Sequence, residues 1–182
     1  MKRIYYLSIT AAVILFDLWT KWLVVQRIDL HEAVPIIPNF FQLVHVRNTG
    51  AAFGIGANAD SRIIPLLLNG GAIAVFCVVV VYALRSAVTD RLLQTELHLI
   101  LGGAIGNLLD RFRFGYVVDF LDVFVGPHHW PAFNVADSAI CVGVSLLVLD
   151  LLRPHRRPAA DGVALPLESP PNPGSANAPG PL

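Results

Sequence analysis

Charged residues are scarce in this chain. Asp, Glu, Lys and Arg make up only 14% of its 182 residues, whereas in soluble domains they account for about a quarter. Hydrophobic residues make up 55%, and the mean hydropathy is +0.62. The 13 basic and 13 acidic residues cancel, so the chain has no net positive charge that would attract nucleic acid. The composition predicts a membrane-embedded protein and argues against DNA or RNA as a partner.

Cysteines and metal-binding patterns are also sparse. The two cysteines, Cys77 and Cys141, lie inside apolar runs, where a thiol usually packs as a small hydrophobic group rather than forming a disulfide. The pair His128-His129 lacks the surrounding ligand spacing of a zinc site. We therefore expect neither a metal nor a cofactor.

Long apolar runs, by contrast, are abundant. Four of them cover residues 4–25, 63–84, 92–109 and 135–152. A helix needs about 20 apolar residues to cross the hydrocarbon core of a bilayer, and about 17 can suffice. The sequence therefore predicts an all-α integral membrane protein with four transmembrane helices.

The distribution of basic residues predicts the orientation of these helices, because Lys and Arg near the ends of spans concentrate on the cytoplasmic side. The side that holds both termini carries Lys2, Arg3, Arg85, Arg91, Arg153, Arg156 and Arg157. The other side carries Arg27, Arg47, Arg62, Arg111 and Arg113. We expect both termini to be cytoplasmic and the longer outer segments to carry the chemistry. Arg111 and Arg113 do not follow this rule, because they come directly after the third span on the expected outer side. Acidic partners or a substrate would have to stabilise them there.

Two segments outside the spans have a distinct composition. Residues 40–47 combine aromatic and β-branched residues and precede the turn signal Asn48-Thr49-Gly50, which predicts a small sheet on the outer membrane surface between the first two helices. Eight of the 13 prolines occur from Pro154 onward. We expect a membrane domain over residues 1–153 and a disordered cytoplasmic tail over residues 154–182.

Several polar residues interrupt the apolar spans. Asp17 and Lys21 are four residues apart in the first span and can neutralise each other there. Gly102 and Gly106 have the spacing that lets a second helix approach the third span closely. The residues that follow these glycines are Asn107, Asp110 and Arg111. They could orient a peptide carbonyl, or they could simply cap the helix end and form an Asp–Arg pair.

Asp119 and Asp137 are the strongest candidates for catalysis. Both lie where apolar chain meets the membrane boundary, and a carboxylate there is costly unless it is paired, hydrated or used. Asn134 precedes Asp137 by three residues and is well placed to cap the fourth helix. Two close carboxylates that share one proton can activate water and polarise a peptide carbonyl. Spacing alone leaves Asp122 as an alternative to Asp119.

Five ordered motifs resemble those of a known family, the bacterial lipoprotein signal peptidases, or signal peptidase II. They are residues 17–21 (DLWTK), 47–53 (RNTGAAF), 102–111 (GGAIGNLLDR), 117–120 (VVDF) and 133–137 (FNVAD). The resemblance runs from the first span to the fourth. Only the tail lies outside it.

The resemblance implies an intramembrane aspartyl endopeptidase of the bacterial inner membrane. Its partners would be membrane lipids and prolipoproteins whose cysteine carries diacylglycerol, cleaved just before that cysteine. It further implies Asp119 and Asp137 as the catalytic pair. The residues implied to bind substrate are Asn48, Asn107, Arg111 and Asn134, while those implied to support the scaffold are Asp17, Lys21, Gly102, Gly106 and Asp110. A proton-coupled carrier or a non-catalytic membrane scaffold are the alternatives.

Overall fold

The structure is a computed structural model that describes residues 2–50 and 63–152. Within these residues it contains four helices: α1 (Lys2–Arg27), α2 (Ile63–Arg85), α3 (Arg91–Phe114) and α4 (Val135–Leu152). The predicted tail at residues 154–182 lies outside the described residues.

The helices agree with a membrane-spanning protein. In length and composition α1, α3 and α4 can each cross a bilayer, and α2 contributes a further apolar stretch, Gly70–Arg85. Because α2 has 23 residues, it is about 34 Å long, slightly more than the hydrocarbon core of about 30 Å. Cys77 and Cys141 are free cysteines rather than disulfide partners, and both lie on exposed positions of the apolar helices.

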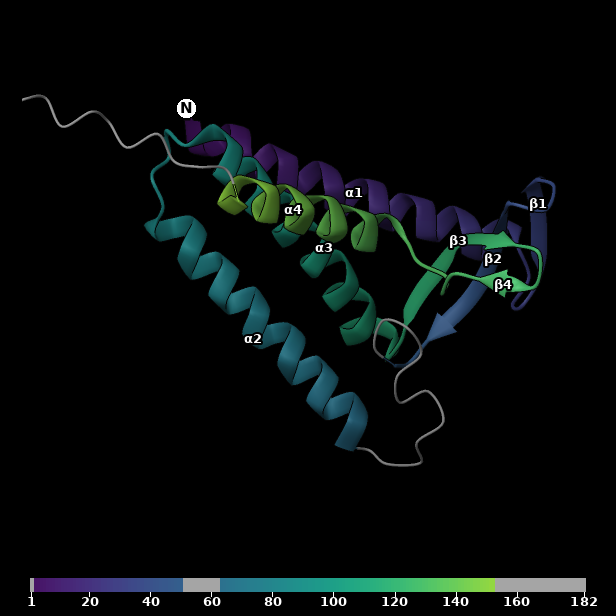
Figure 1. Cartoon of the computed structure of the whole chain (residues 1–182). Coiled ribbons are helices and arrows are strands. Elements are labelled where there is room, and N and C mark those ends of the chain that lie inside the picture. The colour runs from purple at the N-terminus through teal and green to yellow at the C-terminus, as the bar shows by residue number, and fades with distance from the viewer. Residues whose placement is uncertain (1, 51–62, 153–182) are drawn as a thin grey trace, which may run out of the picture. The chain divides into compact units, whose positions relative to one another are not determined.

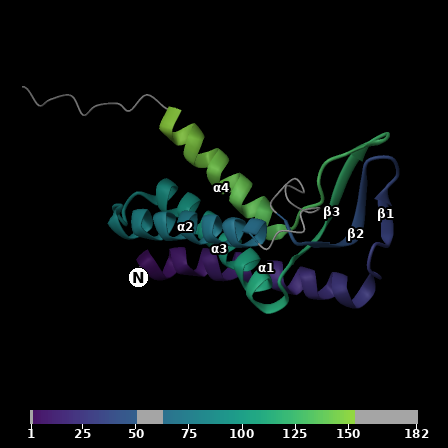
Figure 2. The same ribbon diagram turned by 90° about the horizontal axis from the view of Figure 1, so that it is seen from below.

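Helix α3 is the centre of the helical part, because α1, α2 and α4 all pack against it (Figures 1 and 2). Small residues permit these contacts. A Cβ atom on Gly102 would lie 2.7 Å from Val13 Cβ, and one on Gly106 would lie 2.7 Å from Asp17 Oδ2. The predicted glycine pair therefore lies in the close contact between α1 and α3. The sequence prediction missed Gly143, which plays the same part on α4 against Ile100.

A four-stranded antiparallel sheet lies at one end of the helices (Figure 1). Its order is β1 (Ala33–Ile37), β2 (Phe41–Asn48), β3 (Val117–Val125) and β4 (His128–His129). Strands β1 and β2 confirm the predicted sheet between the first two helices. The structure extends it with β3 and β4, which come from the segment between α3 and α4.

The turn into β3 depends on Gly115. This residue caps α3 with φ +78°, a left-handed conformation that glycine adopts without strain, and donates its N–H to the carbonyl of Arg111. The third helix therefore continues five residues past the predicted end at residue 109, to Phe114. The β-branched and aromatic residues that follow form β3.

Strand β3 is attached to the helices through a small apolar core. Val118 and Phe120 are buried against Val24 and Ile28 at the end of α1. Asp119 lies between these two anchors in the sequence, and its exposed fraction is only 2%. The apolar core thus fixes the strand that carries the first candidate carboxylate.

Candidate active site

The two candidate carboxylates come from different elements and share one pocket. Asp119 lies on β3, and Asp137 lies in the first turn of α4. Both line a pocket of about 480 Å³ whose other walls are largely apolar. This volume is in the range of pockets that bind small molecules or short segments of chain.

Asn134 connects the two aspartates. Its side-chain Nδ2 donates to Asp119 Oδ1 at 2.7 Å, while its Oδ1 accepts from the backbone N–H of Asp137 at 2.9 Å. In return, the backbone N–H of Asn134 donates to Asp137 Oδ2 at 3.3 Å. This reciprocal arrangement is a capping box at the start of α4. The predicted cap is present, and it fixes where the Asp137 carboxylate points.

Asn107 contacts the other oxygen of Asp137. Its Nδ2 donates to Asp137 Oδ1 at 2.7 Å. Its Oδ1 accepts hydrogen bonds from Lys21 Nζ and from Asn134 Nδ2, each at 3.1 Å. The Asn107 side chain is buried, so these contacts determine the orientation of its amide.

A buried charge cluster lies behind Asn107. The Lys21 ammonium is 2.7 Å from Asp17 Oδ2 and 3.0 Å from Asp110 Oδ2. The predicted pair of Asp17 and Lys21 is therefore present, but Lys21 serves a second carboxylate as well. Asp17 also accepts the backbone N–H of Ala136 at 2.9 Å, which links α1 to the first turn of α4. Within residues 2–50 and 63–152 the ionic partner of Asp110 is Lys21, and none of the arginines there pairs with it.

Strand β2 supplies Asn48 to the site. Its Nδ2 donates to Asp119 Oδ2 at 2.9 Å, and its Oδ1 accepts the backbone N–H of Gly50 at 2.9 Å. The turn signal in the sequence thus orients the Asn48 amide. Arg111 also lines the pocket, and it forms no ion pair within residues 2–50 and 63–152.

Burial, together with the nearby charge of Asp137, raises the pKa of Asp119 from 3.8 to about 7. The hydrogen bonds from Asn48 and Asn134 and the charge of Lys21 act in the opposite direction but do not outweigh burial. A carboxyl group with this pKa can give or take a proton near neutral pH.

Asp122 is engaged elsewhere. Its carboxylate accepts from Gln42 Nε2 at 2.6 Å and lies 2.9 Å from His129 Nδ1. It does not line the pocket that Asp119 and Asp137 share. Spacing alone could not separate Asp119 from Asp122, because pairing within the sheet decides which side chain reaches the pocket.

The pocket also contains residues that the sequence did not single out. Its walls include Pro131, Ala132, Phe133, Ser138 and Ile140, together with Trp130 and Cys141. Their signal was present in part, since Phe133 begins the FNVAD motif and Ser138 directly follows it. Wall residues of this kind are recognised only once β3 and α4 are placed side by side.

Comparisons with known proteins agree with this geometry. The family described as signal peptidase (SPase) II matches residues 9–153. The lipoprotein signal peptidase of Syntrophotalea carbinolica is 54% identical over 144 residues, which cover 79% of this chain and 88% of that protein. The lipoprotein signal peptidase of Geobacter metallireducens is 45% identical over 154 residues, 84% of this chain and 93% of that protein.

A solved structure has the same architecture. A bacterial membrane enzyme determined by the in meso method at 2.3 Å resolution superimposes with a TM-score of 0.67. The two sequences are 28% identical, and the superposition covers 81% of this chain and 87% of that chain. The helices and the sheet are thus similar to those of a known bacterial membrane enzyme.

Proposed function

The chain belongs to the signal peptidase II family, and on that premise we propose that Asp119 and Asp137 are the residues with which it removes signal peptides from prolipoproteins. It is an aspartic endopeptidase, and its substrates carry diacylglycerol on the cysteine that follows the cleaved bond. The observation that carries the residue assignment is the bridge through Asn134, which binds one oxygen of Asp119 and caps the turn that holds Asp137.

In the proposed reaction, the two aspartates hold different protonation states. Burial raises the pKa of Asp119 to about 7, so it holds the shared proton up to about that pH. Asp137 accepts hydrogen bonds from Asn107 Nδ2 and from the backbone N–H of Asn134, at the N-terminus of α4. Hydrogen-bond donors and a helix N-terminus both favour a negative charge. Asp137 is therefore the ionised member.

Each protonation state has a task. The Asp137 carboxylate takes a proton from a water molecule, and the resulting hydroxide attacks the carbonyl carbon of the scissile peptide bond. The protonated Asp119 donates to the carbonyl oxygen of that bond, where negative charge develops. Asp137 then gives the proton that it took from water to the leaving amine as the carbonyl re-forms and the C–N bond breaks, which releases the signal peptide with a new C-terminal carboxyl group and regenerates the ionised Asp137.

Arg111 and the apolar walls of the pocket position the substrate beside the dyad. Arg111 faces the pocket without an ionic partner in the described part of the chain, so its guanidinium is free to bind carbonyl oxygens of an extended peptide. The apolar walls near Phe133 and Ile140 suit the hydrophobic residues of a signal peptide and the diacylglyceryl chains. Asn48 and Asn134 hold Asp119 in place rather than binding the lipid.

The protein is an integral membrane protein of bacteria, and we propose that the dyad lies at its extracytoplasmic face with both termini in the cytoplasm. The sheet would then lie on the outer surface, and the loop between α2 and α3 on the inner one. Cysteine labelling tests this orientation in a background that lacks Cys77 and Cys141. An impermeant thiol reagent added to intact cells should label His128→Cys but not Thr89→Cys, and the reverse result would invert the topology.

Cleavage by the purified protein tests the function. The substrate is a prolipoprotein with the diacylglyceryl group already attached, and the control is the same precursor without it. We expect release of the signal peptide from the modified precursor alone. Cleavage of both precursors at the same rate would contradict the requirement for the lipid, and cleavage of neither would contradict the function.

A further inference from the structure

A second pocket is separate from that of the dyad and includes residues of the N-terminal turn of α1 and of the loop between α2 and α3. Both of these segments lie at the end of the helices that is remote from the sheet (Figure 1). The pocket has a volume of about 340 Å³ and is formed by α1, α2, α3 and the loop between α2 and α3. The hydroxyl of Tyr6 donates to the carbonyl of Val88 at 3.2 Å and ties α1 to that loop. None of the residues proposed for catalysis lines this pocket.

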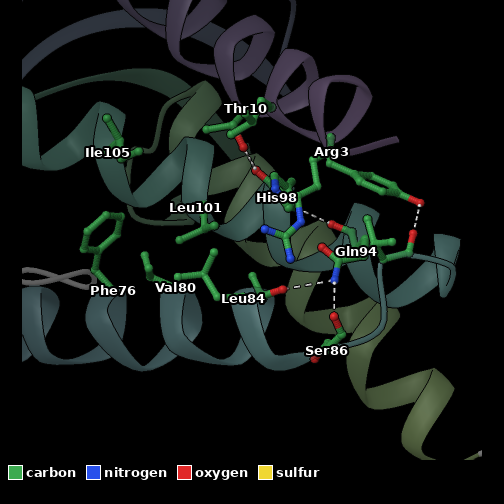
Figure 3. A pocket seen from close by; sticks show the side chains of 14 residues that line it. Arg3, Thr10, Phe76, Val80, Leu84, Ser86, Gln94, His98, Leu101 and Ile105 are labelled. Atoms are coloured by element: carbon green, nitrogen blue, oxygen red, sulfur yellow. Dashed lines mark hydrogen bonds between the residues drawn. The ribbon is translucent and has the colours of Figure 1, made fainter. Parts of the chain in front are cut away.

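The lining changes character along the pocket. Arg3, Ser86 and Gln94 lie at one end of it, and Phe76, Val80 and Ile105 lie toward the other (Figure 3). The face of α3 shows the same order, with Gln94, His98, Leu101 and Ile105 at successive turns. The pocket is therefore polar at one end and apolar along its length.

The size of the pocket matches one half of a bilayer. Gln94 and Ile105 are eleven positions apart on α3, so about 16 Å of helix separates them. The hydrocarbon core is about 30 Å thick, so one leaflet contributes about 15 Å. A ligand that follows this face would reach from the membrane surface to near the midplane, as the acyl chain of a lipid does.

The polar end selects a negative headgroup. Arg3 is exposed at the mouth of the pocket and forms no ion pair with any carboxylate in the described ranges. Gln94 instead uses its Nε2 to hold the carbonyls of Ala83 and Ser86, at 3.1 and 3.4 Å. Arg3 is thus the one described cation that lines the pocket, and a guanidinium binds phosphate oxygens in a bidentate manner.

We propose that this pocket binds one anionic glycerophospholipid of the leaflet that surrounds the N-terminal end of α1. The lipid phosphate contacts Arg3, and one acyl chain lies against Val80, Leu101 and Ile105. The bound lipid fills the space between α1 and α2, both of which pack against α3. This site is independent of the peptidase dyad.

Native mass spectrometry of the delipidated protein in detergent tests the proposal. Phosphatidylglycerol and phosphatidylcholine with the same acyl chains serve as probes. We expect one phosphatidylglycerol to bind each chain, about tenfold more tightly than phosphatidylcholine, because only the anionic headgroup lacks a cation of its own to compete with Arg3. A broad series of bound lipids without headgroup preference would mean annular lipid only and would overturn the proposal.

Two pairs of variants separate this site from general attraction to the membrane surface. Arg3→Gln should abolish the preference for phosphatidylglycerol, whereas Arg85→Gln, an equal loss of charge on exposed α2 surface outside the pocket, should keep it. Val80→Phe should fill the pocket and weaken both lipids, whereas Val78→Phe, on an exposed position of α2, should weaken neither. Equal effects within either pair would contradict the site. Melting curves confirm that each variant is folded. The first pair tests the headgroup contact and the second tests the space for the acyl chain, so the two results are independent.

Discussion

Lys21 and Asn107 are joined by a buried hydrogen bond, 3.1 Å between Nζ and Oδ1. Because an ammonium group can only donate, this contact fixes which end of the Asn107 amide faces Lys21. The amide NH2 group is left to donate to Asp137 Oδ1, at 2.7 Å. A charged group in the first helix thereby orients a donor for a carboxylate in the fourth, which makes the charge cluster part of the positioning of the site.

Removing the donor of Asn107 should slow the reaction without unfolding the protein. In Asn107→Asp, the new carboxylate can still accept from Lys21 but can no longer donate to Asp137. We expect kcat to fall about 100-fold with little change in KM, as for other lost donors in active sites. Asn39→Asp, an exposed position in the turn between β1 and β2, is the matched control. Full activity of Asn107→Asp would remove this donor from the mechanism.

Lys21 should be the residue of the charge cluster that is most costly to lose. Lys21→Met leaves Asp17 and Asp110 as unpaired buried carboxylates, and we expect it to lower the free energy of unfolding by about 3–5 kcal/mol. Adding Asp17→Asn and Asp110→Asn to the same chain should restore much of that loss, because the buried negative charges disappear with their partner. Thermal unfolding in detergent measures both effects. A single variant as stable as the parent would show that the cluster does not contribute to stability.

The catalytic dyad should behave as one unit. Asp119→Asn and Asp137→Asn keep the size of each side chain but cannot exchange a proton with water, so each should lose nearly all turnover while still binding substrate. The double variant should be scarcely slower than either single one. Asp122→Asn is the control, because Asp122 contacts Gln42 and His129 instead of the pocket. Substantial cleavage by a folded Asp119→Asn or Asp137→Asn protein would remove that residue from the pair.

The sequence predicted the helices well, because each span is a long apolar run and the length needed to cross a bilayer is known. It also placed Asn134 as a cap and paired Asp17 with Lys21, since both are local relationships of three or four residues. Strands β3 and β4 were missed, although Val117–Val125 is rich in β-branched and aromatic residues. Attention to that pattern between Gly115 and Gly126 would have found β3.

Contacts between residues far apart in the chain could not be predicted from the sequence, for a physical reason. The second ionic partner of Lys21 is Asp110, and the donors to Asp119 come from β2 and from the start of α4. These groups come into contact only when α1, α3 and α4 pack together. The spacing of residues along the chain does not predict such contacts. For the same reason, spacing could not decide between Asp119 and Asp122.

The close approach of α1 and α3 predicts a steric effect at Gly106. A Cβ atom there would lie 2.7 Å from Asp17 Oδ2 and 3.3 Å from Ala136 Cβ, so Gly106→Ala should push the charge cluster apart. We expect a loss of about 1–3 kcal/mol in the free energy of unfolding. Gly71→Ala on α2 is the control. Among the described residues, no atom outside the adjoining backbone of α2 lies within 4 Å of the new Cβ, so the higher helix propensity of alanine should leave stability unchanged or improved. Equal stability of both variants would contradict the close packing.

The pKa of Asp119 predicts how stability depends on pH. The folded protein retains the proton of this carboxyl group up to a pKa of about 7, whereas the unfolded chain releases it near 3.8. This contribution to the free energy of unfolding is fully present below about pH 4 and is lost as the pH rises through about 7. Stability should therefore decline across that interval, and the decline should be smaller in Asp119→Asn. An equal slope in that variant would assign the pH dependence to other groups.

Activity should depend on the same group, over a similar pH range. If protonated Asp119 is the acid, kcat/KM should fall as the pH rises through about 7, on the alkaline side of a bell-shaped profile. The hydrogen bond from Asn48 lowers the pKa of Asp119, so Asn48→Ala should raise this pKa and move the alkaline limb to higher pH. The profile separates this effect from a simple loss of substrate binding, which would lower kcat/KM at every pH without moving the limb. An alkaline limb that stays in place in Asn48→Ala would show that Asp119 is not the group that sets it.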